Sequence, residues 1–100
     1  MGSVELVRVR EAGVVQARVL RVVFSDGVVR ELDFAPCQDG LFALLRDDEV
    51  FRAVAVDPVA GTVSFPGGID LDPDVLRGVA EAASPQQPVL VREYRVEHSA

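Results

Sequence analysis

The chain has 100 residues, which is enough for one domain with a single hydrophobic core and too few for two. Its 49% hydrophobic and 26% charged residues exclude a disordered chain, and its single cysteine excludes an intramolecular disulfide. The net charge is -6 and the 10 basic residues, all arginine, form no cluster, so direct binding of nucleic acid is disfavoured.

No segment of the sequence suits a membrane or an export signal. No run approaches the roughly 18 apolar residues that a spanning helix needs. Near the N-terminus Glu5, Arg8 and Arg10 interrupt the valines, which leaves no apolar region for a signal peptide. We therefore expect a cytoplasmic protein that does not bind membranes.

The first third of the chain is rich in valine, which packs well on a pleated sheet. We expect a first strand over residues 4–10 and a turn at residues 11–13, which end on a glycine. A second strand is expected over residues 14–24 and a third over residues 28–34. The third strand should end before Pro36, since proline has no N–H to contribute to a sheet.

The loop between the second and third strands follows from the side chains around it. A two-residue loop would mix polar and apolar residues on both faces of the hairpin. A three-residue loop that ends at Gly27 instead places Leu20 opposite Leu32 on one face. The other face then carries Arg21 opposite Glu31, a pair of opposite charges. We therefore predict a type I turn followed by this glycine in the left-handed conformation.

A short helix and a second hairpin are expected next. Asp47 has the character of an N-cap, because two acidic residues follow it in what would be the first helical turn. Residues 54–56 and 62–65 flank a turn and should pair as antiparallel strands. Setting Val56 opposite Val63 gives this hairpin one apolar face.

The chain should close with a second helix and a tail. Asp72 followed by proline is typical of a helix start, and the helix should extend to about residue 83 with Val79 on its buried side. We expect a single α+β domain over residues 1–83 and a linker and tail over residues 84–100, in which residues 89–96 would supply an extra strand. The expected fold is a small antiparallel sheet built from hairpins, with two short helices packed on it.

An ordered set of turn motifs resembles a widespread prokaryotic family known only as domain of unknown function 2442. The motifs that carry the resemblance occupy residues 21–27 (Arg-Val-Val-Phe-Ser-Asp-Gly), 31–36 (Glu-Leu-Asp-Phe-Ala-Pro), 40–42 (Gly-Leu-Phe), 56–63 (Val-Asp-Pro, then Gly-Thr-Val) and 65–76, which begin Phe-Pro-Gly-Gly-Ile-Asp. The resemblance covers roughly residues 4–77. The chain departs from the family near Phe65 and Gly67, where a tryptophan and an asparagine are usual.

The resemblance implies a compact α+β domain without assigned catalytic residues. Some relatives carry a helix-turn-helix after this domain, and some look like partners in small toxin–antitoxin-type gene pairs. Here the residues after position 83 are too few and too rich in proline for a helix-turn-helix. The DNA-binding part of the implication therefore does not extend to this chain.

The spacing of acidic residues around the start of the second helix resembles part of a calcium-binding loop. Asp70, Asp72 and Asp74 have the right spacing, and Glu81 stands at the twelfth position. The loop needs a glycine at its sixth position for a sharp turn, and this chain has Val75 there. A helix start explains the same aspartates better, so we expect no metal and no cofactor.

Isolated residues that suggest catalysis also have simpler explanations. Cys37 needs a neighbouring base to act as a nucleophile, and the only histidine, His98, lies in the tail. One cysteine and one histidine are too few for zinc, so a structural thiol is expected. Gly67 and Gly68 precede a helix as a phosphate-binding loop does, but nearby aspartates would repel a phosphate and the chain has no lysine.

The charged residues of the first hairpin allow two interpretations. Arg21 and Glu31, together with Arg18 and Arg30, would form a charged face of the sheet. A solvated face is the favoured interpretation, because charge runs are usually hydrated. The alternative is a partner-binding surface, where arginine is enriched.

The favoured functional hypothesis is a non-enzymatic protein-interaction module, an antitoxin-like or regulatory member of a gene pair that forms homodimers or binds a protein partner. The open edges of a small sheet invite the addition of a strand, and no catalytic constellation is visible. A second hypothesis is a small-ligand binder or enzyme that uses Asp70 and Asp72 in a pocket between sheet and helices. A third is an accessory of a transcriptional regulator.

Overall fold

A computed structural model of the chain describes residues 7–37, 39–82, 84 and 86–96. The described part contains seven strands, two α-helices and one 3₁₀ helix, η1. In chain order these elements are β1 (Val9–Gln16), β2 (Val19–Phe24), β3 (Val28–Asp33), η1 (Gly40–Arg46), α1 (Asp48–Arg52), β4 (Ala55–Asp57), β5 (Thr62–Phe65), β6 (Ile69–Asp70), α2 (Pro73–Arg77) and β7 (Val89–Arg95).

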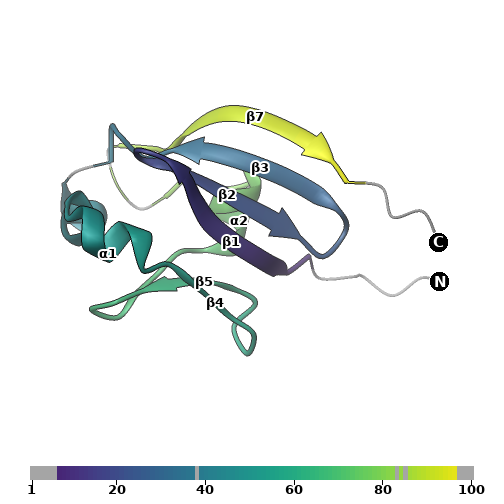
Figure 1. The fold of residues 1–100 in the computed structure, drawn as a ribbon, viewed down its shortest axis with the longest axis horizontal. Coiled ribbons are helices and arrows are strands. Elements are labelled where there is room, and N and C mark those ends of the chain that lie inside the picture. The colour runs from purple at the N-terminus through teal and green to yellow at the C-terminus, as the bar shows by residue number, and fades with distance from the viewer. Residues whose placement is uncertain (1–6, 38, 83, 85, 97–100) are drawn as a thin grey trace.

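The strands form two antiparallel sheets, and the α+β class expected from the sequence is confirmed. A four-stranded sheet has the order β1-β2-β3-β7, and a three-stranded sheet has the order β4-β5-β6. Figure 1 shows the larger sheet as a twisted layer with α2 behind it and the β4–β5 hairpin below it. The sequence patterns predicted the hairpins but did not separate the strands into two sheets.

The register predicted for the β2–β3 hairpin is confirmed. Leu20 lies opposite Leu32, and Arg21 lies opposite Glu31. The N–H of Gly27 donates to the carbonyl of Phe24 at 3.0 Å, and this glycine has a φ of 90°. The β4–β5 register also agrees with the sequence-based expectation.

The predicted first strand, the first turn and the start of the second strand are wrong, because the chain turns later than its glycine suggests. β2 begins at Val19 rather than at residue 14. β1 runs through Gly13, which pairs with Arg21 inside the ladder. The turn falls at Ala17 and Arg18, between the paired residues Gln16 and Val19. Ala17 has a φ of 38°, so alanine rather than glycine takes the left-handed conformation there. Residues 4–6 of the predicted first strand lie outside the described residues.

The helix starts are confirmed, but α2 is shorter than predicted. Asp47 accepts a hydrogen bond from the Glu49 N–H at 2.9 Å, and Asp72 accepts one from the Asp74 N–H at 2.8 Å. α2 ends where Gly78 adopts a φ of 88°, so Val79 is 71% exposed rather than buried. The 3₁₀ helix η1 was not predicted from the sequence.

The core lies between the inner face of the larger sheet and the elements below it. Phe51 of α1 contacts Phe34 at a ring distance of 5.6 Å and Phe65 of β5 at 5.9 Å. It thereby joins the end of one sheet to the other. Other fully buried side chains of this core include Leu20, Val22, Phe24, Cys37, Phe42, Leu45, Val63 and Leu76. No helix in the described ranges is long and apolar enough to cross a membrane.

Candidate interaction surface

β7 is one of the two outer strands of the larger sheet, and among the described residues it has a neighbouring strand on one side only. It pairs antiparallel with β3 and is the last strand of the sheet order, so no strand of the described chain covers its other edge. Figure 1 shows this strand, in yellow, along the rim of the molecule. Three successive apolar side chains lie exposed at its start: Val89 at 55%, Leu90 at 45% and Val91 at 50%.

A bulge divides β7 into an irregular and a regular half. Leu90 pairs with Leu32 and Arg92 pairs with Glu31, so Val91 is an extra residue that has no partner residue on β3. Bulges twist an edge strand and hinder further pairing at that point. The regular half of β7, which we define as residues 92–96, continues past this bulge in an unbroken register.

The backbone groups of the regular half alternate between β3 and the free edge. The N–H of Val96 donates to the carbonyl of Gly27 at 2.8 Å, which directs its backbone toward the β3 side. Successive residues of a strand direct their N–H and C=O groups to opposite sides. Glu93 and Arg95 therefore direct their N–H and C=O groups outward, away from β3.

The side chains of the regular half are held in place by residues of the neighbouring strands. On the outer face, Arg21 Nε donates to the Tyr94 hydroxyl at 3.2 Å, and the Arg92 guanidinium lies 4.6 Å from the centre of the Tyr94 ring. The hydrogen bond to Tyr94 raises the pKa of Arg21. On the inner face, the carboxylate of Glu93 lies 3.3 Å from Arg30 Nε. This part of the edge is an ordered surface.

The four residues expected to form one charged face are separated by the fold. Arg21 and Glu31 do share the outer face, where Arg92 Nε lies 3.7 Å from the Glu31 carboxylate. Arg30 lies opposite Val22 on the inner face and is only 8% exposed. Arg18 stands 4.5 Å over the Phe51 ring and pairs with an aspartate of α1. The expectation that all four residues share one charged face is therefore wrong, because Arg18 and Arg30 do not lie on the outer face.

The buried guanidinium of Arg30 lies against the end of α2. A Cβ built on Gly78 would lie 2.2 Å from Arg30 Nη1, so this position has room only for glycine unless the arginine moves. Arg30 also lines a cavity of about 270 Å³ with Glu81 and Leu90. Its cationic group lies near the C-terminal end of a helix, where positive charge is favourable. This contact joins α2 to the inner face of the sheet.

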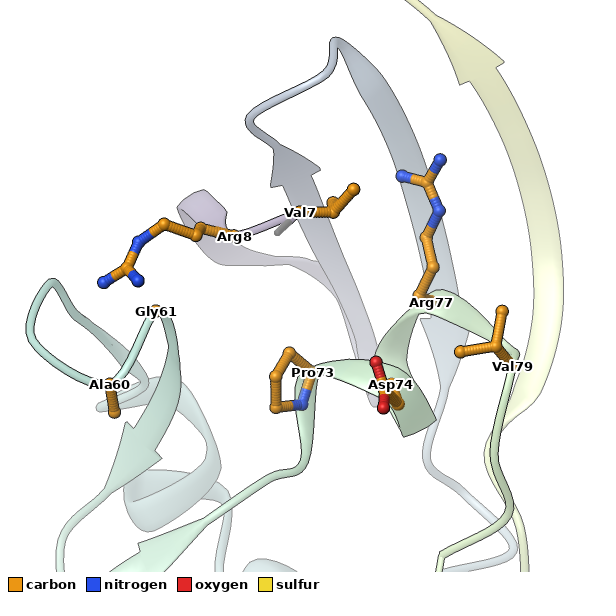
Figure 2. Close-up of a pocket in the computed structure, with 8 residues that line it drawn as sticks. All are labelled: Val7, Arg8, Ala60, Gly61, Pro73, Asp74, Arg77 and Val79. Atoms are coloured by element: carbon orange, nitrogen blue, oxygen red, sulfur yellow. The ribbon is translucent and has the colours of Figure 1, made fainter. Parts of the chain in front are cut away.

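A large hollow lies between α2, the turn after β4 and the start of β1. It has a volume of about 520 Å³. Figure 2 shows Arg8 reaching from one side toward the turn around Gly61, while Arg77 rises from α2 on the other side. Arg8 donates to the carbonyl of Val59 at 3.1 Å, and Arg77 Nη2 donates to Asp26 at 2.7 Å. Both guanidinium groups therefore have protein partners.

The acidic residues that resemble a calcium loop lie around a smaller cavity. Asp70, Asp72 and Glu81 line a space of about 210 Å³ next to Phe34 and Phe42. One oxygen of Asp72 is occupied by the helix cap. Among the residues that the structure describes, no group of three or more histidine, cysteine, aspartate or glutamate side chains could hold a metal ion.

The remaining candidates are structural in this fold. Cys37 is fully buried, and this burial raises the pKa of its thiol to about 11, so the reactive thiolate is disfavoured. Gly67 and Gly68 both have positive φ and form the expected turn. His98 lies outside the described residues.

Comparison with known families bears out the resemblance seen in the sequence. The model of a family described as protein of unknown function (DUF2442) matches residues 9–81. The chain belongs to this family. No curated protein and no solved structure matches the chain. The matched segment of this DUF2442 protein ends before β7, so the edge strand lies outside it.

The sequence predicted the strand β7 but not that one of its edges would be unpaired in the described chain. A strand over residues 89–96 was expected from the sequence, but its neighbouring strand was not. Pairing with β3 covers one edge, and no strand of the described ranges pairs with the other. The burial of Arg30 was also missed, although its place opposite Val22 follows from the predicted hairpin register.

Proposed function

We propose that this DUF2442 chain is a non-enzymatic protein-interaction module that binds a partner strand along the free edge of β7. In this proposal it serves in the cytoplasm as the antitoxin-like or regulatory member of a small prokaryotic gene pair. The observation that carries the proposal is the unpaired outer edge of β7 in the described chain, toward which Glu93 and Arg95 direct their backbone groups. The gene-pair role rests on the family resemblance.

Strand addition suits this edge for physical reasons. Main-chain hydrogen bonds supply affinity when an extended segment joins a sheet, and alternate side chains supply specificity. The edge carries both signs of charge, in Arg92, Glu93 and Arg95, which favours a partner segment whose charges are complementary in the paired register.

The test compares two substitutions at one outward-facing position. Glu93→Pro removes an N–H that makes no bond to β3, whereas Glu93→Ala keeps this N–H and removes only the side chain. The tagged chain is co-expressed with the product of the adjacent gene and purified. We expect the wild type and Glu93→Ala to retain the partner and Glu93→Pro to lose it, because the bonds at stake belong to the backbone.

Hydrogen exchange provides the structural readout of the same experiment. The amides of Glu93 and Arg95 should exchange fast in the free chain and slowly in the complex. Thermal melting of both variants controls for loss of the fold. If the chain formed no complex with this partner and no oligomer at about 100 μM, a concentration at which even weak edge pairing is detected, the interaction hypothesis would be wrong.

A second candidate function is favoured by the cavity beside Asp70 and Asp72. Two carboxylates next to the apolar wall formed by Phe34 and Phe42 suit a small cationic ligand with an apolar body. A thermal-shift screen against divalent metals and organic amines tests it, since a ligand that binds only the folded chain raises its melting temperature. A shift that Asp70→Asn abolishes would support this function over the interaction module.

A further inference from the structure

The edge of β7 is complementary to a second copy of itself in one register. Only the regular half, residues 92–96, is suited to continuous pairing, because the bulge at Val91 interrupts the strand before it. This segment carries both signs of charge, in Arg92, Glu93 and Arg95. Two such edges that meet antiparallel around a two-fold axis form one continuous sheet.

The alternating direction of the backbone N–H and C=O groups limits the registers in which two β7 edges can pair. In a two-fold antiparallel pair that keeps the faces of both sheets aligned, residues opposite each other must direct their side chains to the same face. Residues that exchange hydrogen bonds must also both direct their backbone groups outward. Glu93 and Arg95 meet both conditions. In the regular half, each hydrogen-bonded pair therefore joins one of these two residues to the same or the other residue of the second copy.

Charge then selects one register from those that remain. A two-fold axis at Glu93 would set this carboxylate against its own copy, and an axis at Arg95 would set two guanidinium groups together. Like charges directly opposite each other are destabilising, and opposite charges are favourable. An axis at Tyr94 places each Glu93 opposite Arg95 of the second copy, so two complementary pairs form at once.

We propose that β7 pairs antiparallel with β7 of a second copy, with Tyr94 on the two-fold axis. This proposal rests on the proposed function and names the second copy as the occupant of the same edge. The two Tyr94 residues would form a non-hydrogen-bonded pair on the outer face, where side chains approach most closely. Arg21 and Arg92 already hold each ring in place. The result is one sheet across both copies.

Cysteine substitutions along the regular half identify the register between the two β7 strands directly. In a Cys37→Ala background, Arg92, Glu93, Tyr94 and Arg95 are each replaced by cysteine and treated with oxidised glutathione. A residue on the two-fold axis faces its own copy at a Cα distance of about 4.5–5.5 Å, which a disulfide can span. We expect Tyr94→Cys to become mainly a covalent dimer.

The matched control is Arg92→Cys, which lies on the same face and on the same strand. In the proposed register its Cα is about 14 Å from its own copy along the strand, beyond the reach of a disulfide. Thermal melting of each variant establishes that it is folded. Light scattering of the unmodified chain should give twice the monomer mass, and Glu93→Pro should return it to the monomer.

Each outcome of the scan decides the proposal. Strongest crosslinking at position 92, 93 or 95 overturns the register with Tyr94 on the axis. A monomer in light scattering, with no crosslink at any position, overturns self-pairing altogether. The proposed function then stands or falls separately, by whether Glu93→Pro abolishes capture of the adjacent gene's product.

Discussion

At the scale of single residues, arginine has three different roles that its position in the sequence does not reveal. Arg21 lies on the outer face and donates to a tyrosine, whereas Arg30 is buried against α2. Arg77 forms two hydrogen bonds with the carboxylate of Asp26 and lies 4.9 Å from the Phe24 ring. The chain has no lysine, and the planar, always charged guanidinium suits these contacts.

The Asp26–Arg77 pair predicts a pH dependence of stability. The hydrogen bonds from the Arg77 guanidinium hold the pKa of Asp26 below its ordinary value, and the Val28 N–H contributes to the same shift. A carboxyl whose pKa is lower in the folded chain adds stability above its unfolded pKa. This stability is lost as the pH falls through the folded value.

We therefore expect Asp26→Asn to lower the melting temperature at pH 7, with a difference from wild type that disappears near pH 2. Thermal melts across this range measure it. Asp48→Asn is the control, because it disturbs an ion pair whose carboxylate is 73% exposed and should have a smaller effect at pH 7. A difference between Asp26→Asn and wild type that stayed constant down to pH 2 would contradict the assignment.

At the scale of the elements, the helix starts could be predicted and one helix end could not. Asp47 and Asp72 act as N-caps through contacts with residues two positions later, so the signal is local. α2 ends at Gly78, where the left-handed conformation is combined with close packing of Arg30 from the sheet. That second condition depends on a residue far away in the sequence.

Three glycine-to-alanine substitutions separate the backbone from the packing contribution. Gly78→Ala introduces both a left-handed alanine and a clash with Arg30, whereas Gly68→Ala introduces only the first, since nothing lies within 4 Å of its Cβ position. Gly13→Ala introduces neither. A left-handed alanine costs about 1–2 kcal/mol of unfolding free energy.

We expect the free energy of unfolding to fall most for Gly78→Ala, less for Gly68→Ala, and hardly at all for Gly13→Ala. Urea denaturation of the three variants measures the order. Equal losses for Gly78→Ala and Gly68→Ala would show that the packing of Arg30 against α2 adds nothing to the cost of the backbone conformation.

At the scale of the whole molecule, a small group of phenylalanines joins the two sheets into one folding unit. Phe51 is fully buried and lies against Phe34 on one side and Phe65 on the other. α1 contributes this ring although the helix has only five residues. Such a short helix is not stable alone, so its conformation depends on the packing of this side chain.

Phe51→Ala should lower the free energy of unfolding by about 3–5 kcal/mol, the usual cost of removing a buried phenylalanine. Hydrogen exchange should show faster opening in both sheets, because the lost ring contacts each of them. Val59→Ala is the control with no expected change, since Val59 is 89% exposed. Faster exchange confined to β4, β5 and β6 would show that the two sheets unfold independently.

The sequence by itself determined the antiparallel α+β class, the register of the β2–β3 hairpin and the two N-caps. These features depend on side-chain alternation and on contacts between residues close in the chain, which patterns record directly. Only the tertiary structure decided that β1 continues through Gly13, that Arg30 is buried and that one edge of β7 has no neighbouring strand among the residues described. Each of these depends on which distant segment lies alongside, because pairing and packing between remote elements override local turn signals.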